Sequence, residues 1–351
     1  MAKNIIGYAA RSATSAIELF QFQRRDSRAN DVEIKILYCG VCHSDLHQAR
    51  NDWGNSLYPM VPGHEIVGKV ISVGSAVSKF TTGDTVGVGC MVDSCQVCSA
   101  CEKGLEQYCE SQTTLTYNDI DRHDKQPTFG GYSETIVVSD KFVLNIPESL
   151  NLEAVAPLLC AGITTWSPLR HWKVGKDSKV AVIGLGGLGH MALKLAKALG
   201  AHVTLFTRSE GKEADARRLG ADEIVLSTNE AEMESVKGKF DLIIDTVPYI
   251  HDLNPYIPTL SLNGTLVLVG YLGGLEPALN TMPLILGRKA VAGSLIGGIA
   301  ETQEMLDFCG EHNITSDVEM IKMQDINEAY ERMLKSDVKY RFVIDMATLK
   351  A

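Results

Sequence analysis

The spacing of hydrophobic residues changes about halfway along the chain. Up to about residue 150, short runs of β-branched residues alternate with Gly and Pro, which is typical of strands joined by turns. Such runs occupy 32–37, 65–73, 84–88 and 134–138. The pattern predicts an irregular, mostly antiparallel β domain. Two stretches within it, 90–112 and 113–129, have almost no periodicity, and such segments are usually functional or held by a metal.

After residue 151 the pattern becomes an alternation of strands and helices. We expect a helix over 152–169, an apolar strand over 179–183, a glycine-rich turn, a helix over about 190–199 and a strand over 202–206. Further strands are expected near 223–226, 242–245, 264–269 and 289–295, and a last strand over 340–345. Strands that alternate with helices imply a parallel, doubly wound sheet, so the fold class is α/β with a second, β-rich domain.

Composition and charge narrow the classes of function. The 351 residues suggest about two domains, and 45% hydrophobic residues supply a sizeable core. Lys and Arg total 33 against 43 Asp and Glu, so the formal charge is -10. An acidic surface disfavours nucleic acid and anionic membranes as partners. Because we see neither a long apolar stretch nor a signal-peptide pattern in residues 1–20, we expect a cytoplasmic enzyme with a small-molecule substrate.

A glycine-rich motif follows the predicted strand 179–183. Residues 184–189 read Gly-Leu-Gly-Gly-Leu-Gly and open a helix, which is the context in which G-x-G-x-x-G binds a dinucleotide. The first glycine allows a tight turn, the second lets the backbone approach a pyrophosphate, and the third lets helix and strand pack closely. The helix N-terminus adds N–H donors. We therefore predict cofactor contacts from Gly184, Gly186, Gly187, Leu188 and Gly189; a turn that binds nothing is the alternative.

The residues after the second strand of this unit favour NADP(H) over NAD(H). An NAD site usually places an acidic residue about 20 residues beyond the motif. This chain instead has Thr207, Arg208, Ser209 and Lys212. Cations and hydroxyl groups suit a 2′-phosphate. A solvated polar loop is the alternative interpretation.

Four of the nine cysteines lie in one short segment. Cys95, Cys98, Cys101 and Cys109 are spaced C-x2-C-x2-C-x7-C. An odd cysteine total without a secretory signal fits metal or thiol chemistry better than disulfides. Four sulfurs are the shell that structural zinc prefers. An iron–sulfur cluster is the competing interpretation, but no Pro follows the fourth cysteine and no second cluster motif is present.

A second possible metal site is dispersed along the chain. Cys42, His64 and Cys160 would supply three ligands and leave a fourth position open for substrate, as in a catalytic zinc site. From the spacing alone, a core thiol at Cys160 and a hydrogen-bonded histidine at His64 explain the residues equally well.

Several motifs make a family resemblance recognisable. Residues 63–68 read Gly-His-Glu-Ile-Val-Gly and continue to Gly74 and Val77; the other matching stretches are 40–47, 51–54 and 156–162. Over essentially its whole length the chain resembles the zinc-dependent medium-chain alcohol dehydrogenases, most closely the NADP-dependent cinnamyl-alcohol-dehydrogenase branch and its bacterial aldehyde reductase relatives. The resemblance implies a GroES-like catalytic domain over 1–152 and 297–351 and a Rossmann dinucleotide-binding domain over 153–296.

The resemblance also implies two zinc ions per chain. The structural ion belongs to the four clustered cysteines, and the catalytic ion belongs to Cys42, His64 and Cys160, with Glu65 as an alternate ligand. A homodimer is implied in the same way. The remaining cysteines, Cys39, Cys90 and Cys309, are not assigned to a metal.

Further roles follow where the motif positions match the family. Asp45 corresponds to the residue that orients the zinc-binding histidine, Ser44 to the hydroxyl beside the substrate oxygen, and His47 to the end of the proton relay. His43 stands where the family often has a cation that faces the pyrophosphate. Arg208 is a departure, because close relatives often carry a small hydroxyl residue there. Residues near the metal loops are expected to line the substrate pocket, with core packing as the equal alternative: Trp53, Cys90, Met91 and Leu115.

These features predict a zinc-dependent, NADP(H)-linked oxidoreductase that interconverts aromatic or medium-chain aldehydes and primary alcohols, acting mainly as an aldehyde reductase. A polyol or sugar dehydrogenase is the alternative within the same class. A zinc- and nucleotide-binding protein without catalysis is the alternative from another class.

Overall fold

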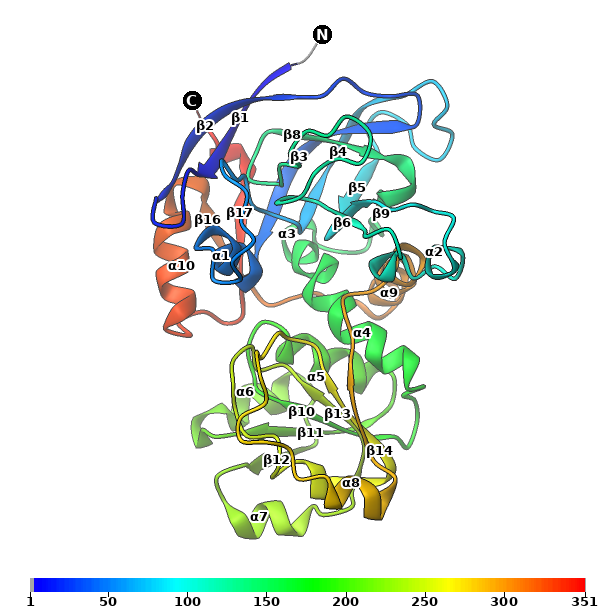
Figure 1. Cartoon of the computed structure of the whole chain (residues 1–351), viewed down its shortest axis with the longest axis vertical. Coiled ribbons are helices and arrows are strands. Elements are labelled where there is room, and N and C mark those ends of the chain that lie inside the picture. Colours follow the sequence, from blue (N-terminus) through cyan, green and yellow to red (C-terminus); the bar gives the residue numbers. More distant parts are fainter. Residues whose placement is uncertain (1–2, 351) are drawn as a thin grey trace. The chain divides into compact units, whose positions relative to one another are not determined.

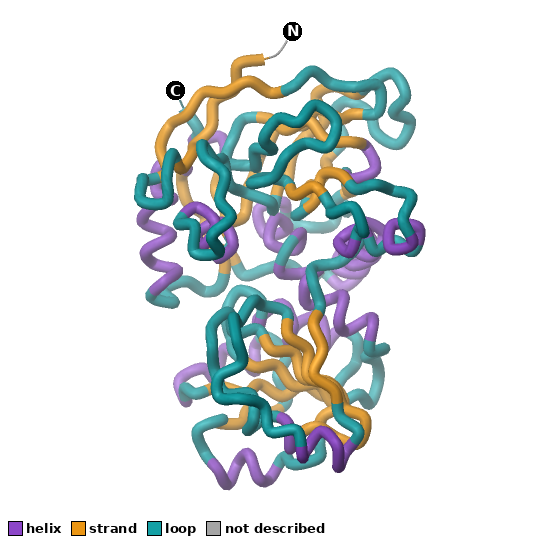
Figure 2. The backbone as a smooth tube through the Cα atoms, viewed as in Figure 1, coloured by secondary structure: helices purple, strands orange, loops and turns teal. Residues whose placement is uncertain are grey.

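The computed structural model describes residues 3–350, which form two compact units (Figures 1 and 2). The first unit runs to Ile163 and resumes at Gly297, whereas the second spans Thr164–Ile296. Among the described residues, no single helix has the length and hydropathy needed to cross a membrane. The bent pair Leu152–Leu159 and Ala161–His171 passes that test by length and composition alone.

The first unit is built on a mainly antiparallel sheet, as the sequence predicted. Its strand order is β16-β17-β3-β4-β5-β9, with β8 paired to β3, and only β16 and β17 are parallel among the described pairs. The strands are β3 (Asp31–Val41), β4 (Ile66–Val73), β5 (Thr85–Val88), β8 (Thr135–Ser139), β9 (Leu144–Asn145), β16 (Val318–Lys322) and β17 (Arg341–Asp345). Two smaller ladders join β1 (Lys3–Ala10) to β2 (Ile17–Arg24) and β6 (Met91–Asp93) to β7 (Thr114–Leu115). The helices are α1 (His43–Ala49), α2 (Ser99–Glu102), α3 (Leu152–Val155), α9 (Ile299–His312) and α10 (Ile326–Leu334).

The second unit confirms the predicted parallel, doubly wound sheet. Its order is β12-β11-β10-β13-β14-β15, which is the 3-2-1-4-5-6 order of a dinucleotide-binding sheet. The strands are β10 (Lys179–Ile183), β11 (His202–Thr207), β12 (Glu223–Leu226), β13 (Phe240–Asp245), β14 (Leu260–Leu268) and β15 (Ala290–Gly293). The helices are α5 (Gly189–Ala198), α6 (Glu213–Arg218), α7 (Glu230–Ser235) and α8 (Met282–Gly287). Buried residues such as Ile183, Phe206 and Phe240 fill the core of this unit.

Short 3-10 turns connect many of these elements. They are η1 (Glu106–Tyr108), η2 (Asp140–Phe142), η3 (Ala156–Leu159), η4 (Glu210–Lys212), η5 (Ile257–Thr259), η6 (Met323–Asp325) and η7 (Met346–Thr348).

The continuous helix expected over 152–169 is wrong. Helix α3 ends at Val155, η3 follows, and α4 (Ala161–His171) begins only after Cys160. Pro157 at the start of η3 has no N–H to donate, and Cys160 has φ -130°, ψ -67°, outside the helical range. The interruption therefore sets Cys160 at a break between two helices.

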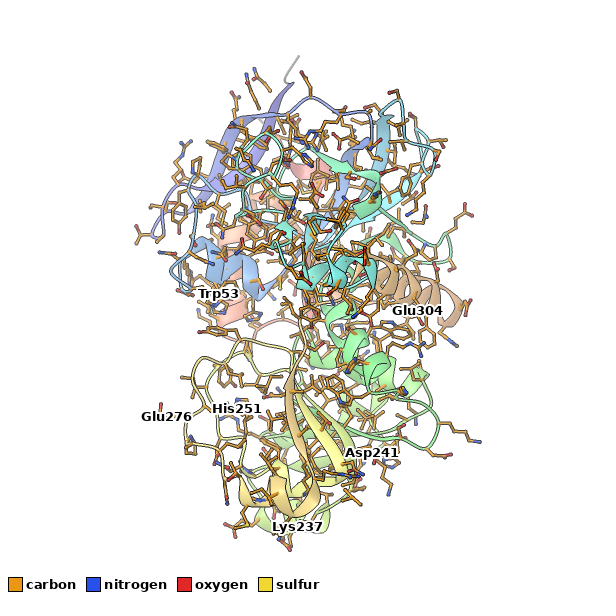
Figure 3. All side chains as sticks on the ribbon, turned by 45° about the vertical axis from the view of Figure 1, so that its right-hand side comes forward. Trp53, Lys237, Asp241, His251, Glu276 and Glu304 are labelled. Carbon is orange, nitrogen blue, oxygen red and sulfur yellow. The ribbon has the colours of Figure 1, made fainter. Side chains whose placement is uncertain are left out.

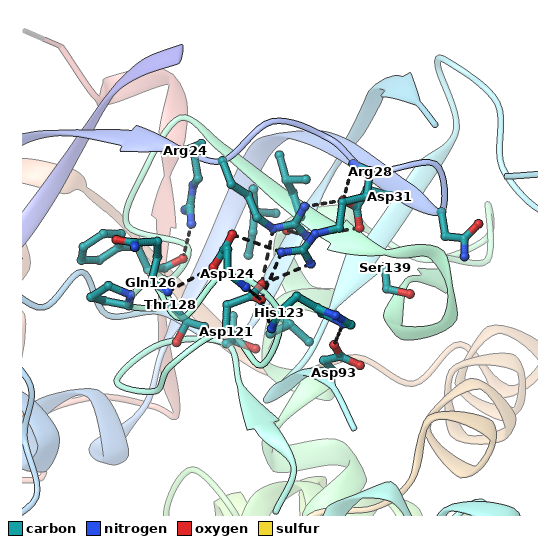
Figure 4. Close-up of a pocket in the computed structure, with 18 of the residues that line it drawn as sticks. Arg24, Arg28, Asp31, Asp93, Asp121, His123, Asp124, Gln126, Thr128 and Ser139 are labelled. Atoms are coloured by element: carbon teal, nitrogen blue, oxygen red, sulfur yellow. Dashed lines mark hydrogen bonds and ion pairs between the residues drawn. The ribbon is translucent and has the colours of Figure 1, made fainter. Parts of the chain in front are cut away.

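The segment 113–129 has little regular structure and is anchored by ion pairs. The Asp121 and Asp124 carboxylates each lie 3.1 Å from Nη2 of Arg28, and Asp121 lies 3.4 Å from Nε of Arg25. These side chains surround a cavity of about 610 Å³ (Figure 4). The network ties the segment to the loop between β2 and β3, and it adds to the short β6–β7 ladder and the Ile120–Pro127 bridge.

Replacing Asp121 tests this anchoring. In Asp121→Asn, the two arginines lose their shared anion, so we expect a loss of about 1 kcal/mol in the free energy of unfolding and faster amide exchange across 113–129. Burial raises the pKa of Asp121, but the His123 and Asp124 N–H groups and Arg28 lower it overall. The stabilisation is therefore present at neutral pH and lost as acid protonates the carboxylate. Urea unfolding and hydrogen-exchange mass spectrometry measure both effects.

A suitable control is Asp337→Asn, whose side chain is 68% exposed beside Arg332. It should change neither readout appreciably. Equal exchange rates across 113–129 in the wild type and Asp121→Asn would contradict the anchoring role.

Candidate active site

The four clustered cysteines converge at one point in the first unit. Their sulfur atoms all lie within 4.8 Å of one another, and Sγ of Cys95 is 3.9 Å from Sγ of Cys101. Four thiolates bound tetrahedrally at about 2.3 Å from a zinc ion would be about 3.8 Å apart. The donor set of Cys95, Cys98, Cys101 and Cys109 therefore fits a structural zinc ion.

Backbone amides prepare this loop for a cation. The N–H of Cys95 donates to Sγ of Cys109, and the N–H of Glu110 donates to Sγ of Cys98, each at 3.4 Å. Backbone hydrogen bonds from Cys101 and Glu110 lower the pKa of Cys98 to about 6. These bonds favour the thiolate form of Cys98, which is the metal-binding form, whereas burial raises the pKa of Cys101 to about 11.

The dispersed residues form a second cluster, also in the first unit. Ligand atoms of Cys42, His64, Glu65 and Cys160 all lie within 4.8 Å of one another, and the two sulfurs are 3.9 Å apart. Cys42 lies between β3 and α1, His64 and Glu65 lie just before β4, and Cys160 lies at the helix break. The sulfur separation again matches two thiolates on one zinc ion. The spacing of these residues in the sequence could not show that they lie together, and the fold brings them together.

A buried carboxylate orients this cluster. Asp45 is fully buried, and it accepts hydrogen bonds from the N–H of Cys42 at 2.8 Å and of Gly63 at 3.1 Å. Its Oδ1 lies 3.1 Å from Nδ1 of His64, and the hydroxyl of Tyr132 lies 3.4 Å from its Oδ2. Burial lowers the pKa of His64, but Asp45 more than compensates and raises it well above its usual value. Because Nδ1 faces Asp45, Nε2 is left for a metal.

Glu65 fits the alternate-ligand role for a geometric reason. One carboxylate oxygen, Oε1, accepts a hydrogen bond from Arg341, while the other, Oε2, is buried without a partner among the described residues. Burial raises the pKa of Glu65 to about 7, against the lowering effect of Arg341. A buried carboxylate that has one oxygen without a donor, in the same cluster as two thiols and an imidazole, suits a cation nearby.

Ser44 and His47 lie on α1 beside the cluster. The Ser44 hydroxyl is 3.6 Å from Sγ of Cys42. His47 places Nδ1 2.8 Å from Oδ2 of Asp52, and its side chain is 26% exposed. One end of the helix therefore reaches the metal ligands while His47 reaches solvent. His43 is partly buried on the same helix, and its ring centroid lies 6.2 Å from that of His47.

The predicted pocket residues divide into two pairs. Cys90 interacts with Cys160 and His64, and the Trp53 ring lies 5.7 Å from that of His47. Met91 and Leu115 instead face each other as partners in the β6–β7 ladder, where Met91 is 3% exposed. None of the described residues that line the 610 Å³ cavity is a predicted zinc ligand, so that cavity is a separate feature.

Sequence reasoning missed four residues of this site. Arg341 comes from β17, 276 positions after its partner Glu65, and no local pattern signals it. The Tyr117 ring stacks on His64 at 5.7 Å, and Tyr132 contacts Asp45. Asp52 alone carried a signal, because it stands in the matching stretch 51–54, shortly after the stretch that ends at His47.

The glycine motif in the second unit has the geometry that a dinucleotide requires. Gly184 has φ +90°, and a Cβ on Gly189 would lie 2.1 Å from the carbonyl oxygen of Gly184. A Cβ on Gly186 would meet nothing within 4 Å, so the backbone there is open to a ligand. Leu188, after Gly187, occupies the N-cap position of α5 and makes no side-chain capping bond. The turn therefore fits a pyrophosphate at the helix N-terminus.

The predicted 2′-phosphate residues share one cavity of about 140 Å³. Ser209 donates its N–H to the Thr207 hydroxyl at 3.1 Å, and Thr207 is itself buried. Arg208 lies 3.3 Å from the Tyr249 hydroxyl, and Lys212 reaches the Leu185 carbonyl at 3.5 Å. Burial and the nearby Arg208 lower the pKa of Lys212. Two cations at one small cavity fit a phosphate group.

Comparison with known proteins agrees with the folds of both units. Residues 28–148 match the alcohol dehydrogenase GroES-like domain, and residues 187–311 match the zinc-binding dehydrogenase family. Aldehyde reductase YahK of Escherichia coli (strain K12) is 55% identical over 342 residues, which is 97% of each protein. NADP-dependent alcohol dehydrogenase C of Mycobacterium bovis is 51% identical over 345 residues, 98% of this chain and 99% of that protein.

A solved structure extends the likeness to the fold. The structure of CAD from Helicobacter pylori complexed with NADP(H) has a TM-score of 0.93 at 44% identity and covers 100% of both chains. Matches of this extent show the family, and this chain belongs to the zinc-dependent medium-chain alcohol dehydrogenases.

Proposed function

We propose that this protein is a zinc-dependent, NADP(H)-linked oxidoreductase that interconverts aldehydes and primary alcohols, and that it acts mainly as an aldehyde reductase. The observation that best supports this proposal is the second cluster. Two sulfurs 3.9 Å apart, an imidazole and a carboxylate converge there, next to the Ser44 hydroxyl. The names of the relatives, aldehyde reductase and NADP-dependent alcohol dehydrogenase, support the same activity.

The residues of the cluster have different roles in the reaction. When bound, zinc supplies a Lewis acid for the substrate oxygen and NADPH supplies the hydride. Cys42, His64 and Cys160 would hold the ion, Asp45 fixes the tautomer of His64, and Glu65 is the alternate ligand.

A proton path runs along α1. Ser44 donates its hydroxyl proton to the oxygen of the product, and His47 restores that proton from solvent. Asp52, 2.8 Å from Nδ1 of His47, orients the imidazole so that Nε2 is free to exchange. Reversing these steps oxidises the alcohol.

We further propose the domain division at 1–152 with 297–351 for catalysis and 153–296 for the dinucleotide. The compact units divide after Ile163 instead, which keeps Cys160 with the other ligands of its cluster. Trp53 and Cys90, which contact His47, His64 and Cys160, would form an apolar wall that favours aromatic or medium-chain aldehydes. The charge of -10 opposes nucleic acid or anionic membranes as partners and accords with a cytoplasmic location.

A homodimer is the assembly that the second unit favours. Strand β15 lies at the edge of its sheet, and an uncovered edge is a template for pairing. Helix α8, just before it, exposes Met282, Ile285 and Leu286 by 58%, 73% and 79%. We propose that two copies join through these edges and bury this apolar surface.

Metal content and activity together test the catalytic site. Wild type should hold about two zinc ions per chain and reduce benzaldehyde or cinnamaldehyde with NADPH. Cys42→Ser should hold about one and lose activity by more than about 1,000-fold, with little change in thermal unfolding, because only the open site loses a ligand. Cys309→Ala, a buried cysteine outside both clusters, should retain both ions and activity. Near-normal turnover by Cys42→Ser with one ion would refute the scheme.

Cofactor preference tests the second site. We expect kcat/KM to be higher with NADPH than with NADH, and Arg208→Ala to lower the NADPH value by about 10- to 100-fold while leaving NADH nearly unchanged. Arg218→Ala, on the exposed face of α6, is the matched control. Running the same assays with a polyol such as mannitol separates a polyol dehydrogenase from an aldehyde reductase. A clear NADH preference would contradict the NADP(H) proposal.

The dimer proposal predicts a change in mass. Light scattering should give twice the chain mass of 38.2 kDa for the wild type and 38.2 kDa for Ile285→Glu, because a buried charge opposes association. Leu334→Glu alters a leucine that is 49% exposed in the other unit, and it should remain dimeric. A dimeric Ile285→Glu would place the interface elsewhere.

A further inference from the structure

A carboxylate and a histidine face each other where β13 ends. The Asp245 side chain is fully buried, and the His251 side chain, in the loop that follows (Figure 3), is 17% exposed. Oδ2 of Asp245 lies 3.2 Å from Nε2 of His251. Both atoms are closed to solvent, and neither has a hydrogen-bond partner among residues 3–350, so their contact is an ion pair and not an aligned hydrogen bond. The other oxygen of Asp245 accepts the N–H of Val247 at 3.1 Å.

The two ring nitrogens of His251 both face acceptors. Nδ1 lies 2.9 Å from the carbonyl oxygen of Tyr249, which can only accept, so Nδ1 must carry a proton. A neutral ring would then turn the lone pair of Nε2 toward the carboxylate of Asp245. Only the imidazolium, with protons on both nitrogens, satisfies both contacts. The surroundings agree, since Asp245 raises the pKa of His251 against the opposing effect of burial.

His251 is linked to the 2′-phosphate site through Tyr249. His251 holds the backbone of Tyr249, and the Tyr249 hydroxyl lies 3.3 Å from Nη2 of Arg208. Tyr249, His251, Arg208 and Lys212 all line the 140 Å³ cavity. The contacts therefore run from the buried Asp245 to His251, and from His251 through Tyr249 to Arg208, the arginine that suits a 2′-phosphate.

The groups that face His251 come from three places. Asp245 ends β13, and Arg208 follows β11 and lowers the pKa of His251. Tyr249 and Tyr256 belong to the loop of His251 itself, and their rings lie 6.4 Å and 6.5 Å from the imidazole; the neighbouring Asp252 acts on Tyr256. Asp245 is the buried anion in contact with the ring, so it has the largest effect on the protonation of His251.

We propose that protonated His251 is a positioning residue of the 2′-phosphate site: together with Asp245 it fixes Tyr249, and thereby Arg208, so that preference for the 2′-phosphorylated nucleotide weakens as His251 loses its proton. This inference rests on the proposed use of NADP(H). Because Asp245 favours the charged form, the proton is kept at neutral pH and lost only as the pH rises above the ordinary range of histidine.

The test uses two nucleotides that differ in one phosphate. The zinc-loaded, full-length protein is titrated calorimetrically with 2′,5′-ADP and with 5′-AMP from about pH 7 to about pH 9, where the phosphate no longer titrates because its second pKa is about 6. We expect the ratio of the two affinities to fall about tenfold over this range in the wild type. In His251→Asn the ratio should be about tenfold lower at pH 7 and independent of pH.

Two further variants separate positioning from general damage. Asp245→Asn should move the fall in the ratio to lower pH, because no carboxylate then holds the proton. His202→Asn, at the exposed start of β11, should behave as the wild type. If His251→Asn does not fold, the pH profiles of the wild type and of Asp245→Asn still test the role of His251.

The outcomes separate the role of His251 from the proposed use of NADP(H). A pH-independent ratio in the wild type, an unchanged profile in His251→Asn, or equal weakening of both nucleotides would overturn the role of His251. If the wild type binds 2′,5′-ADP no better than 5′-AMP at any pH, the NADP(H) proposal itself fails.

Discussion

The buried carboxylate of Asp45 is the interaction on which the first unit's chemistry depends. A charge taken out of water is costly unless donors surround it, and Asp45 is fully buried. The donors are the N–H groups of Cys42 and Gly63 and the imidazole of His64. Satisfying this one group therefore fixes the start of α1 and the residues before β4 against each other. Two metal ligands from separate segments are placed by the same constraint.

A second buried pair ties the end of the chain to this site. Arg341 on β17 donates to Glu65 and to the carbonyl of Val41, and both side chains of the ion pair are almost fully buried. Strand β17 lies beside β3, so the sheet brings residues from both ends of the chain together. A buried pair contributes little net stability. Here it occupies Oε1 of Glu65 and leaves Oε2 without a hydrogen-bond partner among the described residues.

The sequence was informative wherever the chemistry is local. The spacing from Cys95 to Cys109 and the glycines after β10 could be interpreted because each site is built within about fifteen residues. The grouping of Cys42 with Cys160 needed the family resemblance, since spacing alone left a core thiol as an equal interpretation. The helix break at Cys160 was missed because hydrophobic periodicity continues across it.

Contacts between distant side chains were beyond prediction for a different reason. Arg341, Tyr117 and Tyr132 are ordinary residues in their local sequence, and only the pairing of strands reveals what they touch. The same is true of Asp245 and His251, which are separated by a loop whose path no periodicity encodes.

His64 and His251 each face a carboxylate whose side chain is fully buried, and the geometry gives the two histidines opposite roles. His64 turns Nδ1 to Asp45 and leaves Nε2 for a metal, and the ring is neutral when a metal takes that lone pair. His251 turns Nε2 to Asp245 while Nδ1 is already committed to a carbonyl, so no lone pair remains for a metal. The same pair of side chains can therefore prepare a metal ligand or a fixed cation. Which of these results depends on what faces the second nitrogen.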